Sequence, residues 1–220
     1  MTAVVLRCGT RPVPIVLSQL PLLAAESVPT TDNLDELVTK LDAVSQPRAV
    51  VLGDCVALAE VLAKLMRSER LHYEIGFVPD GPCPASLIYG TGVGAAAART
   101  AVSGTPTEVP LIRDDTGRVL VGPAVITGPD DGPVVGEAYV DDHRLFAGEV
   151  KALRVEPTAE LPGVRGAVER GRLRRPKWAH GRAMQLGTPG AVAALNGVTD
   201  GRVRKRVSLY RHADPWILVR

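Results

Sequence analysis

Apolar residues near the start of the chain come in short runs, followed by a helical pattern. Ala3–Leu6 and the stretch from residue 12 to residue 20 are rich in β-branched and apolar side chains, which predicts two short buried strands. Thr31 is expected to begin a helix that Pro47 ends, because a threonine followed by acidic residues is typical of a helix N-terminus. The apolar face of this helix consists of Leu34, Leu37, Val38, Leu41 and Val44.

A strand–helix–strand unit is predicted next. Arg48–Leu52 is an apolar run suited to a central parallel strand, Gly53-Asp54 turns the chain into a helix, and Leu71–Val78 is the following strand. Because helices cover both sides of a parallel sheet, Arg48–Leu52 should be buried on both faces. The helix should carry Glu60–Lys64 as an exposed i,i+4 pair. Its apolar face consists of Leu58, Val61, Leu62, Leu65 and Met66.

After residue 104 the pattern changes to short strands separated by turn residues. Before this point, Gly90–Ser103 predicts one more helix, entered through glycines. The later strands are expected at Val109–Ile112, Val119–Ile126, Val134–Val140, Leu145–Val155, Arg182–Leu186 and Val203–Leu209. We therefore expect an α/β sub-domain with a parallel βαβ unit over residues 1–104. A mainly antiparallel, β-sandwich-like sub-domain should follow over residues 105–220.

The two parts of the chain differ in charge. Of the 220 residues 45% are hydrophobic, and 22 glycines and 18 prolines favour turns and short strands. The net charge is +2, yet residues 1–150 hold 11 basic and 19 acidic residues, a net −8. Residues 151–220 hold 15 basic and 5 acidic residues, a net +10. This asymmetry indicates either an anionic partner for the C-terminal part or attraction between the two parts.

The cysteines bear on the cellular compartment. Cys8, Cys55 and Cys83 are far apart in sequence and lack the spacing of a zinc site or a disulfide framework, which fits a reducing environment. Residues 13–25 have some character of a signal peptide, but prolines and polar residues interrupt the run. No segment is long enough to span a membrane. We therefore expect a cytoplasmic protein without a metal site.

Three turns follow apolar runs in a fixed order along the chain. Gly53-Asp54 lies inside RAVVLGDCVALAEVLAKL, residues 48–65, between a strand and a helix. Ile75–Pro79 continues into Asp80–Pro84, and Leu195–Val198 holds a late Asn-Gly turn. In this layout the chain, from Arg48 to its C-terminus, resembles the bacterial diacylglycerol-kinase-type lipid kinases, which are relatives of the NAD kinases. The corresponding family motifs are Gly-Gly-Asp-Gly-Thr, Gly-Thr-Gly-Asn-Asp and Asp-Gly-Glu.

The resemblance implies a nucleotide-binding kinase fold. It makes Gly53, Asp54 and Gly81 the nucleotide-binding residues if such binding is retained, with ATP and Mg²⁺ required if kinase activity is retained. The sequence of Asp54 and its neighbours is equally typical of a helix N-cap after a strand. Both interpretations of Asp54 stay open at this point.

The chain departs from each of the three motifs. Leu52 replaces the first glycine, and Cys55 and Val56 replace the Gly-Thr, so the close approach of backbone N–H groups to a polyphosphate is lost. The second loop contains Pro82–Pro84, and proline has no N–H to donate. Val198 stands where a glutamate would accept the proton of a lipid hydroxyl. The family's opening Asn-Pro strand motif and first helix are also expected to be missing or shortened.

Three functions from different classes follow from these residues. The first is a degenerate diacylglycerol-kinase-like protein without a catalytic residue, which binds an anionic ligand or a protein partner. The second is an active ATP-dependent lipid kinase with an altered site. The third is a dinucleotide-binding module that uses the loop from Gly90 to Ala95, because Gly90-x-Gly92-x-x-Ala95 matches a loose dinucleotide fingerprint. A glycine-rich helix entrance without a ligand is the plainer interpretation of that loop.

Polar clusters elsewhere have structural interpretations beside the chemical ones. Asp141-Asp142-His143 contains metal-ligand types, but its position between two strand-like runs predicts a turn. His72, His180 and His212 have no partners at metal-ligand spacing.

Basic residues with interleaved aromatic residues are a candidate surface for phosphates, anionic lipid headgroups or single-stranded nucleic acid, the last less favoured. A lipid surface, a protein partner and a second copy of the chain stay open as partners. The alternative is that these charges are solvated or pair with acidic residues. The candidate residues are Arg172, Arg174, Arg175, Lys177, Arg204 and Arg206.

Overall fold

The computed structural model describes residues 2–169 and 175–220 and divides the chain into two units. Unit 1 consists of Met1–Val109 and Asp214–Arg220, and unit 2 of Pro110–Ala213. This division differs from the expected sub-domains 1–104 and 105–220. The reason is that β5 (Pro106–Val109) and β17 (Trp216–Val219), which read as part of the β region, pair with each other inside the sheet of unit 1.

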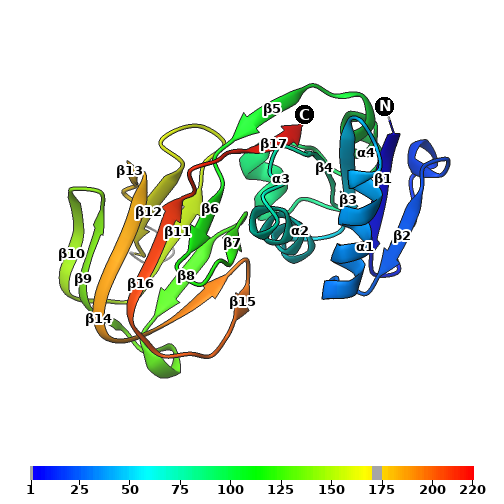
Figure 1. Cartoon of the computed structure of the whole chain (residues 1–220). Coiled ribbons are helices and arrows are strands. Elements are labelled where there is room, and N and C mark those ends of the chain that lie inside the picture. Colours follow the sequence, from blue (N-terminus) through cyan, green and yellow to red (C-terminus); the bar gives the residue numbers. More distant parts are fainter. Residues whose placement is uncertain (1, 170–174) are drawn as a thin grey trace. The chain divides into compact units, whose positions relative to one another are not determined.

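Unit 1 is an α/β structure around one six-stranded sheet (Figure 1). Its strand order is β2-β1-β3-β4-β17-β5, and every neighbouring pair is parallel except β17 with β5. The strands not yet given are β1 (Thr2–Cys8), β2 (Leu22–Ala25), β3 (Pro47–Leu52) and β4 (Glu74–Val78). The expected parallel strand–helix–strand unit is thus confirmed, with β3 and β4 as direct neighbours.

Strand β3 is the buried centre that the sequence predicts. Its residues from Arg48 to Leu52 are at most 1% exposed. One face of the sheet packs against α4 (Gly94–Ser103) and the short 3-10 helix η1 (Ile15–Leu17). Side chains alternate between the two faces of a strand. The side chains of β3 on the opposite face therefore point toward α1 (Thr31–Asp42) and α2 (Cys55–Arg67). The expected apolar contacts of α2 are present, because Leu58, Val61, Leu62 and Leu65 are buried.

Arg48 is a buried charge at the beginning of β3. Its side chain is 1% exposed, and its Nε donates to Glu74 Oε2 on β4 at 2.6 Å. Nη1 donates to the carbonyl of Ala101 at 3.4 Å and to that of Val102, both on α4. The guanidinium therefore links two strands and the end of a helix, and its charge is paired, as a buried charge requires.

Two parts of unit 1 differ from the sequence prediction. The expected strand over residues 12–20 is wrong: these residues hold η1, and the second strand is Leu22–Ala25. Pro12 and Pro14 explain this difference, because proline has no N–H for a strand ladder. The helix expected at Gly90–Ser103 begins at Gly94, and a short helix, α3 (Pro84–Tyr89), precedes it. Between β1 and β2 the helical segment is the three-residue η1, and the first α-helix, α1, begins after Thr30, which forms a capping box with Asn33.

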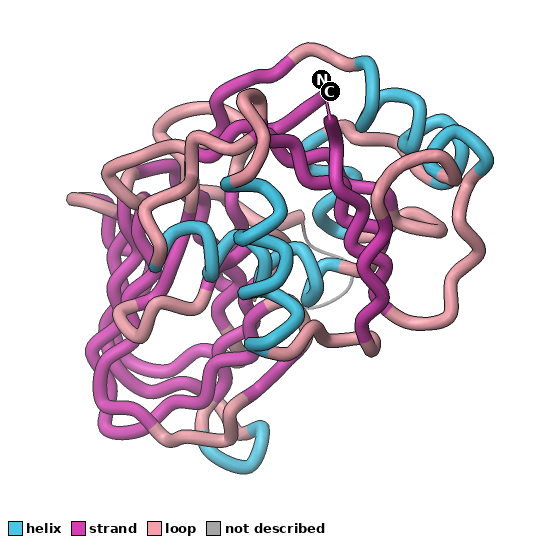
Figure 2. Tube along the Cα trace, turned by 45° about the vertical axis from the view of Figure 1, so that its right-hand side comes forward, coloured by secondary structure: helices cyan, strands magenta, loops and turns pink. Residues whose placement is uncertain are grey.

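Unit 2 is built almost entirely of antiparallel strands, as the sequence predicts for the region after Val109 (Figure 2). One 3-10 helix, η2 (Pro129–Asp131), interrupts the strands of its described residues. The strands are β6 (Ile112–Asp114), β7 (Val119–Leu120), β8 (Ala124–Thr127), β9 (Val134–Val140), β10 (His143–Val150), β11 (Leu153–Pro157), β12 (Val164–Val168), β13 (Ala179–Gly181), β14 (Ala183–Leu195), β15 (Val198–Thr199) and β16 (Arg204–Arg211).

The long strand β14 joins two parts of the sheet in unit 2. Its first half, up to Gly187, pairs with β9 and β16. Its second half, from Ala191, pairs mainly with β8 and β15. The register shifts between Gly187 and Ala191, where the Thr188 hydroxyl donates to the carbonyl of Val135 at 2.6 Å. This irregular segment turns the strand, so that both halves face one apolar core.

In residues 2–169 and 175–220, no helix has the length and apolar character needed to cross a membrane. The longest helix, α2, has 13 residues.

Truncation of Leu62 to alanine should lower the free energy of unfolding by about 2–5 kcal/mol, because it leaves a cavity between α2 and the sheet. Lys64 on the same helix is the matched control. Its ion pair is with Asp35 of α1, where the sequence predicted Glu60, and Asp35 is 55% exposed. Lys64→Ala should therefore cost less than about 1 kcal/mol. Urea unfolding followed by circular dichroism measures the free energy of unfolding of both variants. Equal losses in the two variants would contradict the packing described for α2.

Candidate functional site

The carboxyl ends of four parallel strands meet at one edge of the sheet in unit 1. The segments that leave this edge begin at Gly9 after β1, Glu26 after β2, Gly53 after β3 and Pro79 after β4. The chain passes from β1 to β2 on one side and later to β3 on the other side of β1. Ligands of open α/β sheets bind at such a reversal of strand order. The candidate site is therefore at this edge, close to the ends of β1 and β2.

Gly53 and Asp54, two of the residues implied in nucleotide binding, form the turn between β3 and α2. The N–H of Gly53 donates to the carbonyl of Val78 at 3.3 Å. One carboxylate oxygen of Asp54, Oδ1, accepts from the N–H groups of Val56 and Ala57 at 3.0 and 2.9 Å. Asp54 is thus the N-cap of α2, which is the structural interpretation that the sequence left open.

An ion pair spans this turn. Arg11, in the segment after β1, donates from Nη1 to Asp80 Oδ2 at 2.8 Å, and its Nε donates to the carbonyl of Cys8 at 3.2 Å. Because β3 lies between β1 and β4, the contact connects the loops on either side of Gly53. Gly81, the third implied nucleotide-binding residue, follows Asp80 and has open space around the position of a Cβ atom. The structure therefore brings Gly53, Asp54 and Gly81 to the same edge.

A hollow of about 850 Å³ opens beside the ends of β1 and β2. The Nε atom of Arg7 is buried and has no hydrogen-bond partner within the described chain. Glu26 and Ser27 follow β2 directly, and Asn33 is in the first turn of α1. The residues around the hollow are Arg7, Gly9, Thr10, Ala24, Ala25, Glu26, Ser27, Val28, Thr30 and Asn33.

Sequence reasoning missed Arg7. The signal that could have indicated Arg7 is its position, a charged residue directly after the apolar run Ala3–Leu6 of a parallel strand. A parallel strand is normally covered on both faces, so a charge at its carboxyl end needs either a partner or a ligand.

The loop from Gly90 to Ala95 does not have the context of a dinucleotide fingerprint. Residues 87–89, which would have to be a strand, are the last turn of helix α3. Gly90, Gly92 and Gly94 all have positive φ angles, and the N–H of Gly94 donates to the carbonyl of Pro79 at 2.8 Å. The glycines thus form the connection between two helices, which agrees with the plainer interpretation of this loop as a helix entrance, and the strand that a dinucleotide fingerprint follows is replaced by helix α3.

The turn at Leu195–Val198 is a tight hairpin between β14 and β15. Asn196 and Gly197 have φ angles of 54° and 84°, as this kind of turn requires. The Asn196 carbonyl oxygen accepts from the N–H groups of Val121 and Gly122, and its amide donates to the carbonyl of Val119. Val198 is 47% exposed. Asn196 thus has a structural role, and the position expected for a base carries an exposed apolar side chain.

The acidic turn at Asp141-Asp142 connects β9 and β10, as the sequence predicts. The Asp141 carboxylate accepts from the N–H groups of Arg182 and Ala183 at 2.8–3.0 Å. Across the described residues, no three His, Cys, Asp or Glu side chains are arranged to hold a metal ion.

The candidate anion-binding residues have different surroundings. Arg172 and Arg174 lie outside the described residues. Arg175 and Lys177 are exposed. Arg204 is paired with Asp200, and its side chain is only 13% exposed.

Other basic residues of unit 2 are paired as well. Arg154 and Arg165 both bind Glu156, and Arg118 contacts Asp200 at 3.6 Å. The guanidinium carbon of Arg165 also lies 4.5 Å from the ring centroid of Trp178, so this aromatic residue of the basic segment already has a cation partner.

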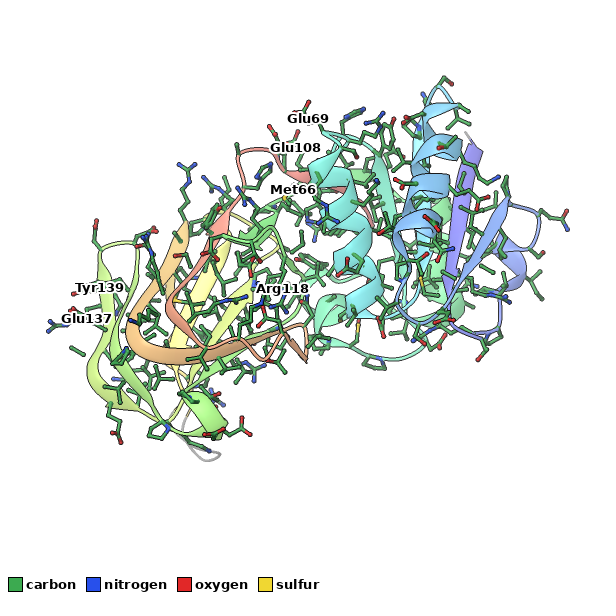
Figure 3. All side chains as sticks on the ribbon, turned by 60° about the horizontal axis from the view of Figure 1, so that its bottom comes forward. Met66, Glu69, Glu108, Arg118, Glu137 and Tyr139 are labelled. Atoms are coloured by element: carbon green, nitrogen blue, oxygen red, sulfur yellow. The ribbon has the colours of Figure 1, made fainter. Side chains whose placement is uncertain are left out.

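Arg206 is exposed beside a shallow hollow of about 330 Å³. Its Nη2 donates to Gln185 Oε1 at 3.4 Å. Glu137 and Tyr139 line the same hollow from β9, where Figure 3 shows them near each other. This surface therefore combines basic and acidic groups.

Unit 1 is thus a mainly parallel α/β sheet with its candidate site at the carboxyl edge, and unit 2 is an antiparallel β unit. No protein-family model matches the sequence, and no curated protein matches it. Solved structures do match over both units. A diacylglycerol kinase from Bacillus anthracis str. Sterne has a TM-score of 0.73 at 10% identity, covering 99% of this chain and 96% of that chain.

An NAD kinase from Archaeoglobus fulgidus in complex with ATP is similar with a TM-score of 0.65 at 12% identity, covering 100% of this chain and 94% of that chain. The protein has the fold of the diacylglycerol kinases and NAD kinases. The likeness includes the first strands and helix α1, so it extends beyond the region from Arg48 onward in which the sequence showed it.

Gly53→Ala should destabilise the protein by about 1–3 kcal/mol, because the added Cβ would lie 2.8 Å from Ala57 Cβ and 3.2 Å from Cys8 Cβ. Gly81→Ala is the matched control at the same edge. It adds a methyl group to open space, at a position without a positive φ angle, and should change the stability by less than about 0.5 kcal/mol. Thermal or urea unfolding measures both, and a neutral Gly53→Ala would show that the turn is not packed as described.

Proposed function

We propose that this protein binds a nucleotide or a similar phosphate-bearing ligand at the carboxyl edge of unit 1 and does not transfer its phosphate. The single observation that carries the proposal is the hollow of about 850 Å³ beside Arg7, a residue of its wall whose buried Nε has no hydrogen-bond partner among the described residues. The guanidinium of Arg7 would supply a positive charge and hydrogen-bond donors to a phosphate in this hollow.

The other groups around the hollow suit the rest of such a ligand. Glu26 directly follows the second strand of a parallel sheet, a position from which a carboxylate binds ribose hydroxyls in other α/β proteins. Ser27 and Thr10 supply hydroxyl groups, and Ala24, Ala25 and Val28 supply apolar surface. A hollow of this size and mixed character accommodates a nucleoside monophosphate or a larger nucleotide. The similar NAD kinase structure is a complex with ATP, which supports a nucleotide as the ligand.

The proposal that no phosphate is transferred rests on what the remaining edge residues already do. Asp54 uses Oδ1 to cap α2, and Asp80 is paired with Arg11. The carboxylate oxygens that Mg²⁺ could use at this edge are therefore partly engaged within the protein. Val198 cannot accept a proton from an attacking hydroxyl. Phosphoryl transfer depends on positioned charge and metal ions, so these substitutions remove its main sources of rate.

The basic residues of unit 2 have a smaller part in this proposal. Arg154, Arg165 and Arg204 are paired with acidic residues of the same unit, which favours a structural role for their charges. We further propose that the protein works in the cytoplasm, supported by the free cysteines Cys8, Cys55 and Cys83.

Nucleotide binding is tested by titration with ATP and ADP, with and without Mg²⁺, followed by calorimetry and thermal shift. We expect binding that does not require Mg²⁺. Arg7→Met should weaken it by about 10- to 100-fold, because a charge-assisted hydrogen bond contributes about 1.5–3 kcal/mol. Arg99→Met, on the exposed side of α4, should leave the affinity unchanged. Equal affinities of the Arg7 and Arg99 variants, or no binding by the parent protein, would overturn the proposal.

Phosphoryl transfer is tested separately with radiolabelled ATP, Mg²⁺ and diacylglycerol in mixed micelles. We expect no time-dependent formation of phosphorylated lipid by the parent protein. Formation of that product at a rate proportional to protein concentration, and its loss in Asp54→Asn, would instead establish an active lipid kinase with an altered site. Nucleotide binding without transfer agrees with the proposal in full.

A further inference from the structure

Two cysteines from adjacent loops meet at the carboxyl edge of the sheet in unit 1. Cys55 is the first residue of α2, after β3, and Cys83 is the N-cap of α3, after β4. The Cys55 thiol donates a hydrogen bond to the sulfur of Cys83. Both are free cysteines, Cys55 buried and Cys83 partly exposed. The edge thus holds a dithiol in which the residue that accepts the hydrogen bond, Cys83, is partly exposed.

The surroundings of the two sulfurs differ. The Cys83 sulfur receives hydrogen bonds from Cys55 and from the backbone N–H groups of Ser86 and Ala85, and the Ser86 hydroxyl beside it donates to the Cys83 carbonyl at 2.9 Å. The bond from Cys55 contributes most, and together these bonds lower the pKa of Cys83 to about 6 although burial opposes the shift. Donors that favour the thiolate make a cysteine more nucleophilic at neutral pH.

Cys55 has the opposite tendency. The hydrogen bond that Cys55 donates to Cys83 and the burial of Cys55 raise the pKa of Cys55. The negative charges of Cys83 and Asp54 raise it further. Tyr89 is the other ionisable group near Cys55. Cys55 therefore keeps its proton while Cys83 is a thiolate.

We propose that Cys83 and Cys55 form an oxidation site, in which Cys83 reacts with a hydroperoxide and Cys55 resolves the product to an intramolecular disulfide. In the first step the Cys83 thiolate attacks one oxygen of hydrogen peroxide. An S–O bond forms, the O–O bond breaks, and the leaving hydroxide takes a proton to become water. Cys83 is then a sulfenic acid, oxidised by two electrons, and the peroxide is reduced.

In the second step the Cys55 sulfur attacks the sulfur of Cys83. The S–S bond forms, the S–O bond breaks, and the leaving hydroxide takes the Cys55 proton to become a second water. The net reaction converts two thiols and one peroxide into one disulfide and two waters. The product connects the first turn of α2 to the beginning of α3. This site does not depend on nucleotide binding, since neither cysteine lines the hollow beside Arg7.

Cys8 is the third cysteine of the chain and serves as the internal control. It is 1% exposed, and burial together with the charge of Asp54 raises its pKa to about 11 despite the opposing charge of Arg11. It should stay a thiol when Cys83 has reacted.

The experiment treats the full chain with one equivalent of hydrogen peroxide near neutral pH and measures the intact mass, the number of free thiols and the disulfide-linked peptides. We expect the loss of two thiols per chain, a mass decrease corresponding to two hydrogens, and one linked pair, Cys55 with Cys83. A reductant should reverse all three. Cys8→Ser should behave like the parent protein. No thiol loss under conditions in which the unfolded chain reacts, or a disulfide that includes Cys8, would overturn the proposal.

Variants separate the roles of the two cysteines. Cys83→Ser should abolish the fast reaction, whereas Cys55→Ala should stop at a sulfenic acid that dimedone captures at Cys83. In the parent protein, the pH profile of Cys83 alkylation by iodoacetamide should have its midpoint near 6, and in Cys55→Ala the midpoint should rise because the main donor is lost. If Cys55→Ala unfolds, the pH profile of Cys83 alkylation in the parent protein still tests the proposal. A midpoint of that profile at the ordinary pKa of a thiol would show that Cys83 is not activated.

Discussion

The last strand of the chain completes the sheet of the first unit. β17 lies between β4, to which it is parallel, and β5, to which it is antiparallel. Trp216, at its beginning, is 1% exposed and contacts Tyr89 of α3 edge to face, with ring centroids 5.3 Å apart. Without β17 the edge of β4 would be unpaired, although β4 is otherwise a buried strand. The six-stranded sheet of unit 1 is therefore complete only with a strand that follows unit 2 in the sequence.

This return fixes how the two units are connected along the chain. Unit 2 begins directly after β5 and ends directly before β17, so both connections leave from neighbouring strands of one sheet. Within unit 2, the N–H of His212 donates to the carbonyl of Leu111 at 2.8 Å, which holds the beginning and the end of that unit together. The contacts between segments more than a hundred residues apart make the fold dependent on long-range pairing.

Hydrophobic spacing predicted the parts of the structure in which burial follows a regular period. Strand β3 lies at a continuous apolar run and is buried on both faces, helix α2 buries the face with helical spacing, and strand β9 alternates between buried and more exposed residues. Hydrophobic spacing failed to predict short segments that contain prolines, and it could not show the pairing of strands that are distant in sequence. The prolines around residues 12–21 end strands and start turns, and Pro84 starts helix α3 in a segment with no helical period. Residues 216–219 fall within the region expected to form the β sub-domain, and only the pairing partners of β17 show that it belongs to unit 1.

The candidate site was harder to predict because the same residues serve the fold. Asp54, to which the resemblance to lipid kinases points, lies at the carboxyl edge, and one of its carboxylate oxygens is used by the first turn of α2. Arg11 and Asp80 neutralise each other across the turn. Arg7 has no motif around it, and its unpartnered Nε became visible only when the neighbours of β1 were known. A sequence shows which residue types are present but not which of their polar atoms remain free.

Gly53, the glycine that remains of the first motif, is required by the fold whether or not a ligand binds. Gly53 leaves no room for a Cβ because Ala57 and Cys8 occupy that space, so the turn needs a glycine even without a phosphate. The motif positions that only a phosphate would require carry Leu52, Cys55 and Val56, with side chains that pack or donate hydrogen bonds within the protein. The fold can therefore keep its strand-to-helix turn without the first glycine and the Gly-Thr of the family motif. The same edge carries other polar groups, among them the guanidinium of Arg7 and the sulfur of Cys83.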